Sequence, residues 1–242
     1  MNLIIDVGNT LIKFAVFQRD KLLEKKGVAI DAALETFKII VKEHKTINNG
    51  IVSSVGKLEK TVLDEIESKI NVLFLNSDTK LPFKNSYRTP HTLGVDRMAL
   101  VSASVKQFPD KNVLIIDAGT CITYDFITKE NEYMGGAISP GIRLRYKTLN
   151  TLTANLPLLD TKMPELLIGN TTESSIHSGV VFGILKEMDG VIDEYQENYE
   201  DLTVILTGGD ANFLSKQLKN SIFANSNFLL EGLNFILEFN SH

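Results

Sequence analysis

Leu3-Ile4-Ile5-Asp6-Val7-Gly8, near the start of the chain, recurs as Leu114-Ile115-Ile116-Asp117-Ala118-Gly119. Five of the six positions agree, at a constant offset of 111 residues. Each copy is a short apolar run, typical of a buried strand, and each ends in Asp-x-Gly. Each copy also opens a series of three strands followed by alternating helices and strands. The sequence therefore predicts an α/β protein built from two related halves, residues 1–112 and 113–242.

Hydrophobic spacing predicts the remaining elements of both halves. Strands are expected at residues 10–18, 21–28, 50–55, 72–75, 122–128, 133–138 and 202–206. Helices are expected at residues 31–44, 58–70, 93–108, 140–152, 211–219 and 229–239. A further long helix at residues 172–198 is expected to break near Gly190. Residues 76–92 carry two prolines and are expected to form a loop.

The composition limits the classes of protein. The chain has 242 residues, with 43% hydrophobic and 23% charged side chains, which is ordinary for a globular protein. A formal charge of −5 argues against broad binding to nucleic acid or to anionic membranes. The single cysteine, Cys121, allows no internal disulfide and indicates a reducing compartment. No secretory signal is visible, and no apolar run approaches the roughly 20 residues that a membrane-spanning helix needs. The sequence therefore predicts a cytoplasmic protein.

The first Asp-x-Gly stretch has the chemistry of a phosphate-binding turn. Gly8 lets the backbone turn tightly, so that a ligand can approach main-chain N–H groups and the side chains of Asn9 and Thr10. Asp6 can hold Mg²⁺, directly or through water, and Lys13 can neutralise a phosphate. A tight hairpin, with Asp6 and Asn9 acting only as turn formers, explains the same residues. The motif alone does not decide between these interpretations.

The second copy favours the phosphate-binding interpretation, because Asp117, Gly119 and Thr120 provide a matching turn. A third glycine turn, Gly208-Gly209, follows a predicted strand. It could lie against a nucleotide, or it could only cap the helix that follows. The chain contains neither G-x-x-x-x-G-K-[ST] nor G-x-G-x-x-G, which excludes a P-loop and leaves a dinucleotide-binding fold unsupported.

Five ordered motifs resemble those of the type III pantothenate kinases. In sequence order they are Asp6-Val7-Gly8-Asn9-Thr10-Leu11-Ile12-Lys13, Gly94-Val95-Asp96-Arg97, Asp117-Ala118-Gly119-Thr120, Gly135-Gly136-Ala137-Ile138-Ser139-Pro140-Gly141 and Thr207-Gly208-Gly209. Together they run from residue 6 to residue 209 and cover most of the chain. The resemblance implies two ribonuclease-H-like domains of the actin-like, acetate and sugar kinase superfamily, with the active site in the cleft between them.

The resemblance also implies an activity and its requirements. The expected reaction is ATP-dependent phosphorylation of pantothenate to 4′-phosphopantothenate, the first step towards coenzyme A. Mg²⁺, a monovalent cation (K⁺ or NH₄⁺) and a homodimer are implied, with no nucleic-acid or membrane partner.

The family pattern assigns roles residue by residue. The residues implied to bind ATP are Asp6, Val7, Gly8, Asn9, Thr10, Leu11, Ile12, Lys13 and Thr120. The residues implied to contact pantothenate are Tyr87, Gly94, Val95, Asp96, Arg97 and Thr172. Asp96 is also implied as the general base, and Asp117 as the residue that holds the monovalent cation.

Simple chemistry supports the central roles. A carboxylate at Asp96 can accept the proton of an attacking hydroxyl, and the guanidinium of Arg97 can pair with the pantothenate carboxylate. By itself, Asp96 could equally be a first-turn acid that stabilises a helix dipole. Thr172 could likewise be a helix cap, with Asn170 and Glu173 spaced as a capping box.

Two other functions remain compatible with parts of the sequence. One is a kinase or phosphatase of the same superfamily that acts on another small molecule, against which the Gly94–Arg97 motif argues. The other is a non-catalytic relative. Loss of the acid at residue 6, 96 or 117 would favour it, but Asp6, Asp96 and Asp117 are all present.

Overall fold

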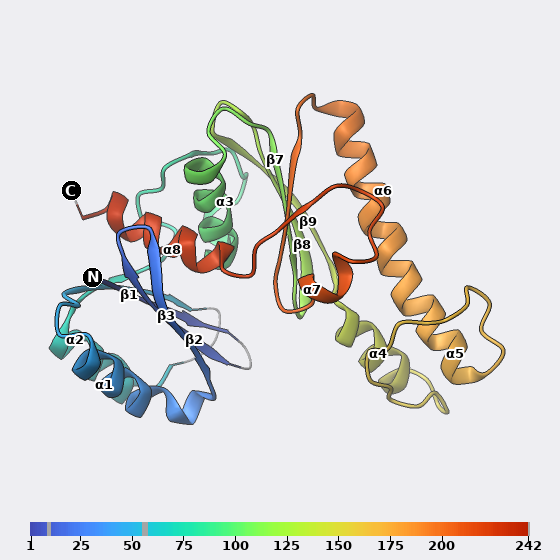
Figure 1. Ribbon diagram of the computed structural model, residues 1–242, viewed down its shortest axis with the longest axis horizontal. Helices are drawn as coiled ribbons and strands as arrows, with labels where there is room; N and C mark the ends of the chain where they lie inside the picture. The colour runs from blue at the N-terminus through green and yellow to red at the C-terminus, as the bar shows by residue number, and fades with distance from the viewer. Residues whose placement is uncertain (9–10, 55–57, 242) are drawn as a thin grey trace. The chain divides into compact units, whose positions relative to one another are not determined.

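The computed structural model describes residues 1–8, 11–54 and 58–241. The chain divides into two compact units (Figure 1). The N-terminal unit contains Met1–Pro109, Asn131–Tyr133 and Asn227–His242, and the C-terminal unit contains Asp110–Glu130 and Met134–Ser226. The end of the chain therefore belongs to the N-terminal unit, a placement that local sequence patterns did not predict. The division at residue 112 stays a prediction about the folding domains.

The N-terminal unit is built on a sheet with the strand order β3-β2-β1-β4-β5 in the described residues. Its strands are β1 (Asn2–Val7), β2 (Ile12–Gln18), β3 (Lys21–Val28), β4 (Asn49–Ser54) and β5 (Asn71–Phe74). The first three strands form an antiparallel meander, and β4 and β5 run parallel to β1. This arrangement confirms the predicted three-strand opening followed by an α/β series.

Helices cover both faces of this sheet. On one face, Ile5 and Val52 pack in a core with α1 (Ala33–Glu43) and α2 (Lys60–Lys69). On the other face, Ile4 and Ile51 pack in a core with α3 (Val95–Gln107) and α8 (Phe228–Phe239). Figure 1 shows α8, at the red end of the chain, beside α3 within this unit. Short 3₁₀ turns at Ile30–Ala32 and Pro90–Thr92 lead into α1 and α3.

The C-terminal unit repeats the same strand order. Its sheet reads β11-β10-β7-β8-β9 in the described residues, and β6 continues it beyond β9. The strands of this unit are β7 (Val113–Ala118), β8 (Cys121–Ile127), β9 (Glu132–Pro140), β10 (Thr203–Thr207) and β11 (Phe223–Ala224), whereas β6 (Lys84–Asn85) belongs to the N-terminal unit. β7 is antiparallel to β8 and parallel to β10, as β1 is to β2 and β4. β6 pairs with Glu132 and Tyr133, which also belong to the N-terminal unit.

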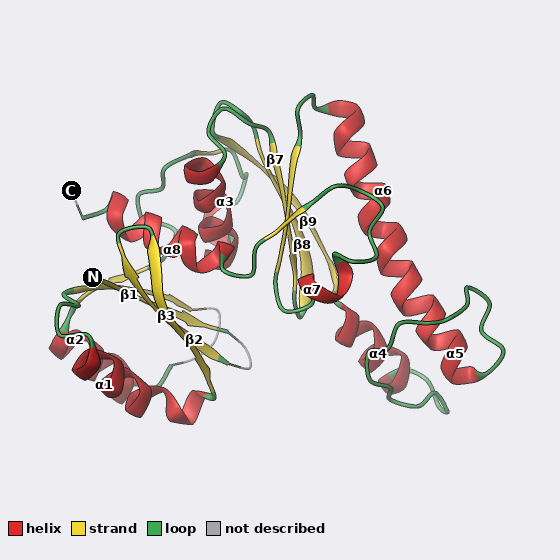
Figure 2. Ribbon diagram, viewed as in Figure 1, coloured by secondary structure: helices red, strands yellow, loops and turns green. Residues whose placement is uncertain are grey.

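One face of this second sheet packs against the helices of the C-terminal unit. Leu114, Tyr124 and Leu206 share a core with Tyr146 of α4 and Met188 of α6. The helices are α4 (Ile142–Thr151), α5 (Thr172–His177), α6 (Gly183–Asn198) and α7 (Ala211–Leu214), shown in red in Figure 2.

The predicted helix at residues 172–198 is interrupted, but not where the sequence suggested. A π-helical segment, Ser178–Phe182, joins α5 to α6, whereas Gly190 lies inside an unbroken α6.

Within the described ranges, no helix is long and apolar enough to cross a bilayer.

Candidate active site

The turn after β1 brings the first predicted phosphate motif to the edge of the sheet. The backbone N–H of Gly8 donates to the carbonyl of Leu11 at 3.1 Å, which closes the turn between β1 and β2. Asn9 and Thr10, both predicted to bind ATP, lie outside the described residues. The side chains of Val7 and Ile12 are buried in the core, so only their backbone groups can meet a ligand. Leu11 is exposed beside them.

Asp6 lies in a row of polar residues that crosses three neighbouring strands. In the β-sheet register Asp6 is opposite Lys13 on β2 and Ser53 on β4, so their side chains share one face. Lys13 Nζ donates to Asp6 Oδ2 at 3.3 Å, and the Lys13 side chain remains nearly half exposed. Burial raises the pKa of the Asp6 carboxyl; Lys13 opposes this shift, and the negative charge of Asp96 adds to it. The site thus pairs a buried carboxylate with an accessible ammonium group.

Asp96 stands in the first turn of α3, on the helix that covers the face carrying Asp6. Its carboxylate folds back over the helix start, where Oδ1 accepts a hydrogen bond from the backbone N–H of Arg97 at 2.9 Å. A Cβ atom on Gly94 would lie only 2.3 Å from Asp96 Oδ1. Glycine at residue 94 therefore makes room for the carboxylate that the family pattern assigns as the general base.

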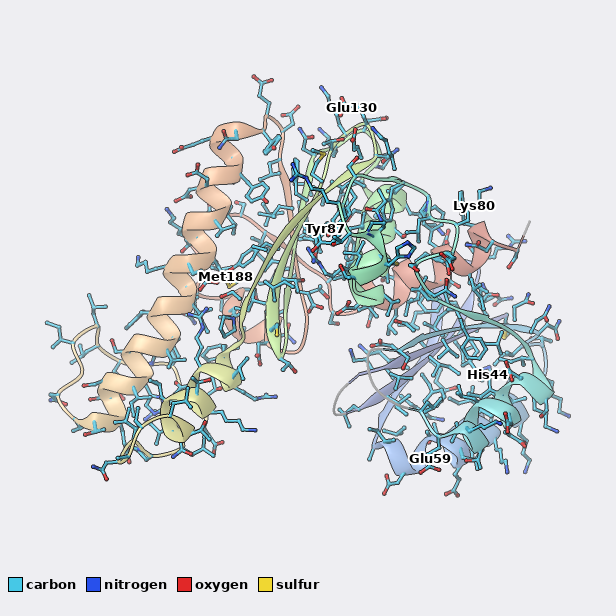
Figure 3. The ribbon with its side chains drawn as sticks, turned by 180° about the vertical axis from the view of Figure 1, so that it is seen from behind. His44, Glu59, Lys80, Tyr87, Glu130 and Met188 are labelled. Atoms are coloured by element: carbon cyan, nitrogen blue, oxygen red, sulfur yellow. The ribbon has the colours of Figure 1, made fainter. Side chains whose placement is uncertain are left out.

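Arg97 is buried beside a group of aromatic rings. Its guanidinium lies over the ring of Tyr87, 5.6 Å from the ring centroid. Tyr87, labelled in Figure 3, stacks on Tyr133 at 6.1 Å, and Phe83 meets the edge of Tyr133 at 5.9 Å. The aromatic group keeps Arg97 in place in the N-terminal unit, next to Asp96. The predicted substrate residues Tyr87, Asp96 and Arg97 are thus close together in this unit.

In the C-terminal unit, glycines of three motifs meet at one loop. Gly119 N–H donates to the carbonyl of Cys121, and Gly141 N–H donates to the carbonyl of Thr120. A Cβ on Gly141 would lie 2.1 Å from the carbonyl oxygen of Gly119. Gly208 has φ +96°, and a Cβ there would lie 2.4 Å from both the Ala118 carbonyl oxygen and Asp117 Oδ1. The sequence could not show that these separate motifs form one constellation.

Asp117 has the position in β7 that Asp6 has in β1. It lies opposite Thr123 on β8 and Thr207 on β10, where Asp6 has Lys13 and Ser53. The second row therefore carries two hydroxyls and no ammonium group. Neutral and anionic oxygens of this kind are suitable ligands for a hard cation.

Asp210, which sequence reasoning did not single out, lies at the same loop. Its backbone N–H donates to the carbonyl of Ala118 at 2.9 Å. Burial raises the pKa of Asp210, and Arg143, whose Nη2 is 3.8 Å from Asp210 Oδ1, opposes that shift. The signal available in the sequence was its position directly after Gly208-Gly209.

Thr172 begins α5 and lines a cavity of about 1110 Å³ in the C-terminal unit. Arg145 and Ser175 line the same cavity, together with apolar side chains such as Leu149 and Val180. The capping box at this helix start is formed by Thr171 and Ser174, one residue later than the predicted pair Asn170 and Glu173. Thr172 is therefore not needed as the cap, and its side chain is exposed.

No three His, Cys, Asp or Glu residues in the described ranges come together as a metal cluster.

Asp6 and Asp117 each stand at the end of the first strand of a ribonuclease-H-like sheet, beside a glycine turn. This fold and these paired turns define the class: an enzyme fold of the actin-like ATPase and sugar kinase superfamily.

Comparison with solved structures agrees with this class. A ROK family glucokinase from Streptomyces griseus superposes with a TM-score of 0.53, at 11% identity over 98% of both chains. A Baf family protein from Campylobacter jejuni superposes with a TM-score of 0.64, at 21% identity over 98% of both chains. At such low identity these likenesses show the fold alone.

Sequence comparison identifies the family. The model of the type III pantothenate kinase family matches residues 2–194. A type III pantothenate kinase of Christiangramia forsetii is 55% identical over 240 residues, covering 99% of each chain. Another, from Flavobacterium psychrophilum, is 50% identical over 99% of each chain. This chain belongs to the type III pantothenate kinase family, as the five motifs predicted.

Proposed function

We propose that this chain transfers the γ-phosphoryl group of ATP to the primary hydroxyl of pantothenate, giving 4′-phosphopantothenate and ADP in coenzyme A biosynthesis. One observation carries the proposal beyond family membership. Asp96, with the buried cation of Arg97 beside it, stands in the first turn of the helix that covers the sheet face bearing Asp6 and Lys13. A proton acceptor, an anion-binding cation and a phosphate-binding turn therefore share one unit.

Asp96 acts as the general base in this proposal. As the pantothenate hydroxyl attacks the γ-phosphorus, a new O–P bond forms, the bond to the β–γ bridging oxygen breaks, and Asp96 takes the hydroxyl proton. Its carboxylate is only partly buried and is oriented by the N–H of Arg97. Most of the rate acceleration would come from positioning and charge neutralisation.

Arg97 and Tyr87 recognise pantothenate in this proposal. The guanidinium can pair with the substrate carboxylate through two parallel hydrogen bonds, and the Tyr87 ring under it restricts its orientation. Gly94 and Val95 would contact the substrate through the backbone at the start of α3. On the nucleotide side, the turn from Asp6 to Lys13 and the loop at Thr120 would contact ATP.

The two cations implied by the family fit the oxygen ligands present. Mg²⁺ usually binds one or two carboxylates together with substrate phosphates and waters, which matches the lone carboxylate of Asp6 and the lack of a larger acidic cluster in the described residues. Mg²⁺ would neutralise charge on the phosphates. Asp117, between Thr123 and Thr207, would hold the monovalent cation, K⁺ or NH₄⁺, which would supply a fixed positive charge.

A homodimer is the assembly that this proposal includes. Large apolar side chains are exposed in the segment that follows α4: Leu152, Leu158, Leu166, Leu167 and Ile168. A second copy covering them would remove apolar surface from water, and would also cover the cavity lined by Thr172. Thr172 would then contact the pantothenate bound by the partner. We also place the enzyme in the cytoplasm, the compartment that its single cysteine leads us to expect.

A direct assay tests the proposal. Purified protein is incubated with Mg·ATP, pantothenate, and either K⁺, NH₄⁺ or Na⁺, and both ADP and phosphopantothenate are measured. Pantothenate-dependent ADP release that needs K⁺ or NH₄⁺ is expected. Asp96→Asn should abolish turnover but keep ATP binding, because the amide cannot accept the proton. Absence of pantothenate-dependent ADP release under every cation would refute the proposed function.

A further inference from the structure

Ser53 is a fully buried hydroxyl in the row that contains Asp6 and Lys13. Its exposed fraction is 0%, and its Oγ has no hydrogen-bond partner among the residues that the structure describes. Buried polar groups are almost always satisfied by protein, water or ligand. Ser53 therefore needs an explanation that core packing does not supply.

The β-sheet register shows which group Ser53 can serve. β4 runs parallel to β1 with Ser53 opposite Asp6, and Lys13 lies opposite Asp6 on the other side. Lys13 donates to Oδ2 of the carboxylate. Side chains of facing residues in adjacent strands lie close enough to interact, so the hydroxyl of Ser53 is on the side of Asp6 that faces away from Lys13.

The Ser53 side chain lies on the face of the sheet that α3 covers. Ile4 and Ile51, two residues earlier on β1 and β4, share their face of the sheet with Asp6 and Ser53. They pack on the α3 side, where Ala99 joins the same core. Asp6 also feels the charge of Asp96 at the start of α3. Ser53 thus belongs to the polar end of this face and not to the core against α1 and α2.

We propose that Ser53 is a positioning residue of the phosphoryl-transfer site, whose hydroxyl hydrogen-bonds the Asp6 carboxylate, directly or through one water, when Mg·ATP is bound. The hydroxyl donates, and the carboxylate accepts. Lys13 can then turn towards a phosphate without leaving Asp6 unsupported. This inference rests on the proposed function, in which Asp6 serves the Mg·ATP complex, and it adds a residue that lies outside the five motifs.

Ser53→Ala is the main test, and Ser102→Ala is its matched control. Ser102 is also fully buried, but its hydroxyl donates to the carbonyl of Met98 at 2.8 Å within α3. Mg·AMPPNP binding is measured by calorimetry on each protein, and thermal unfolding is followed in parallel. Kinetic assays then give the KM for Mg·ATP and the KM for pantothenate.

Loss of the Ser53 hydroxyl is expected to weaken Mg·AMPPNP binding and raise the KM for Mg·ATP by about three- to tenfold, the effect of one hydrogen bond. The KM for pantothenate should change less than about twofold, an amount too small for a lost hydrogen bond. The Tm of Ser53→Ala without ligand should equal that of wild type, because the Ser53 hydroxyl makes no hydrogen bond with the described residues that could be lost. Ser102→Ala should show the reverse, with lower thermal stability and unchanged nucleotide binding.

Ser53→Thr provides a rescue, because it keeps the hydroxyl while adding a methyl group. If it binds Mg·AMPPNP more tightly than Ser53→Ala, the hydroxyl itself is responsible. Unchanged nucleotide binding in Ser53→Ala would overturn the inference, as would equal weakening in both Ser53 variants. The calorimetry needs no pantothenate, so its result stands even if wild-type protein fails to phosphorylate pantothenate, which would refute the proposed function alone.

Discussion

Replacement of Gly94 by alanine is expected to disable the general base while leaving the fold intact. Gly94 is the residue before α3, with φ −60° and ψ 136°, a conformation open to alanine. The added Cβ would lie 2.3 Å from Asp96 Oδ1. Real Cβ atoms essentially never come closer than 3.0 Å to another heavy atom, so the carboxylate must move by about 1 Å to regain an attractive contact.

The size of the effect follows from this displacement. A 1 Å misplacement of a catalytic group can cost about 100-fold in rate, which corresponds to about 2.7 kcal/mol in the activation barrier. The stability cost should stay within about 1 kcal/mol, because the clash is with the end of a side chain, and glycine-to-alanine changes also reduce unfolded-state entropy. Activity and stability should therefore separate in this variant.

The assay compares Gly94→Ala with Gly27→Ala, in which the added Cβ meets nothing within 4 Å. ADP release at saturating substrates gives kcat, and scanning calorimetry gives Tm. Gly27→Ala should match wild type in both, whereas Gly94→Ala should lose about 100-fold in kcat with a Tm shift of no more than about 4 °C. Near-normal kcat in Gly94→Ala, or a loss of activity explained by unfolding, would refute the reasoning.

Three further outcomes are expected. Burial raises the pKa of Asp6, so the contribution of this group to folding stability is present at low pH and is lost as pH rises through the folded pKa. Asp6→Asn should therefore abolish activity and raise Tm more at pH 7 than at pH 3. A larger gain in Tm at pH 3 would contradict this. Gly208→Ala should lower the free energy of unfolding in urea by at least about 1–3 kcal/mol, because φ is +96° and the Cβ would meet the Ala118 carbonyl oxygen. In Gly209→Ala the Cβ has open space, so its free energy of unfolding should stay within about 0.5 kcal/mol of wild type. Equal urea midpoints for the two variants would argue against strain at Gly208. Arg97→Lys should raise the KM for pantothenate about tenfold or more in initial-rate assays, since lysine offers neither the two-pronged hydrogen bond nor the same stacking on an aromatic ring; an unchanged KM would exclude Arg97 from carboxylate binding.

Much of the site was predictable because its residues lie beside glycines at the ends of strands or at a helix start. Asp6 and Lys13 face each other since β1 and β2 form a hairpin, and hairpin register depends on local sequence. Gly94, Asp96 and Arg97 are neighbours in the chain, so their meeting at the start of α3 needs no distant contact. The roles assigned to these residues stay predictions until the assays above are made.

Other features depend on residues far apart in the sequence. Ser53 is opposite Asp6 only because β4 pairs in parallel with β1, with α1 between them in the chain. Gly141 and Gly208 both approach the loop at Gly119, although more than 60 residues separate them. The short strands β6 and β11 pair over only two residues each, too few for any periodic pattern. The π-helical segment also escaped prediction, because its glycine-containing sequence fits an α-helix equally well.

The sequence by itself determined the duplicated α/β architecture, the family and the residues expected to do the chemistry, because strand periodicity, glycine turns and ordered motifs are local. Tertiary structure alone decided which residue lies beside each aspartate on the side away from its hairpin partner. Lys13 and Ser53 flank Asp6, while Thr123 and Thr207 flank Asp117. Lys13 and Thr123 follow from the local hairpins, whereas Ser53 and Thr207 come from parallel strands that are far from β1 and β7 in the chain. Parallel pairing brings together residues with no fixed spacing, so the sequence could not place these two hydroxyls.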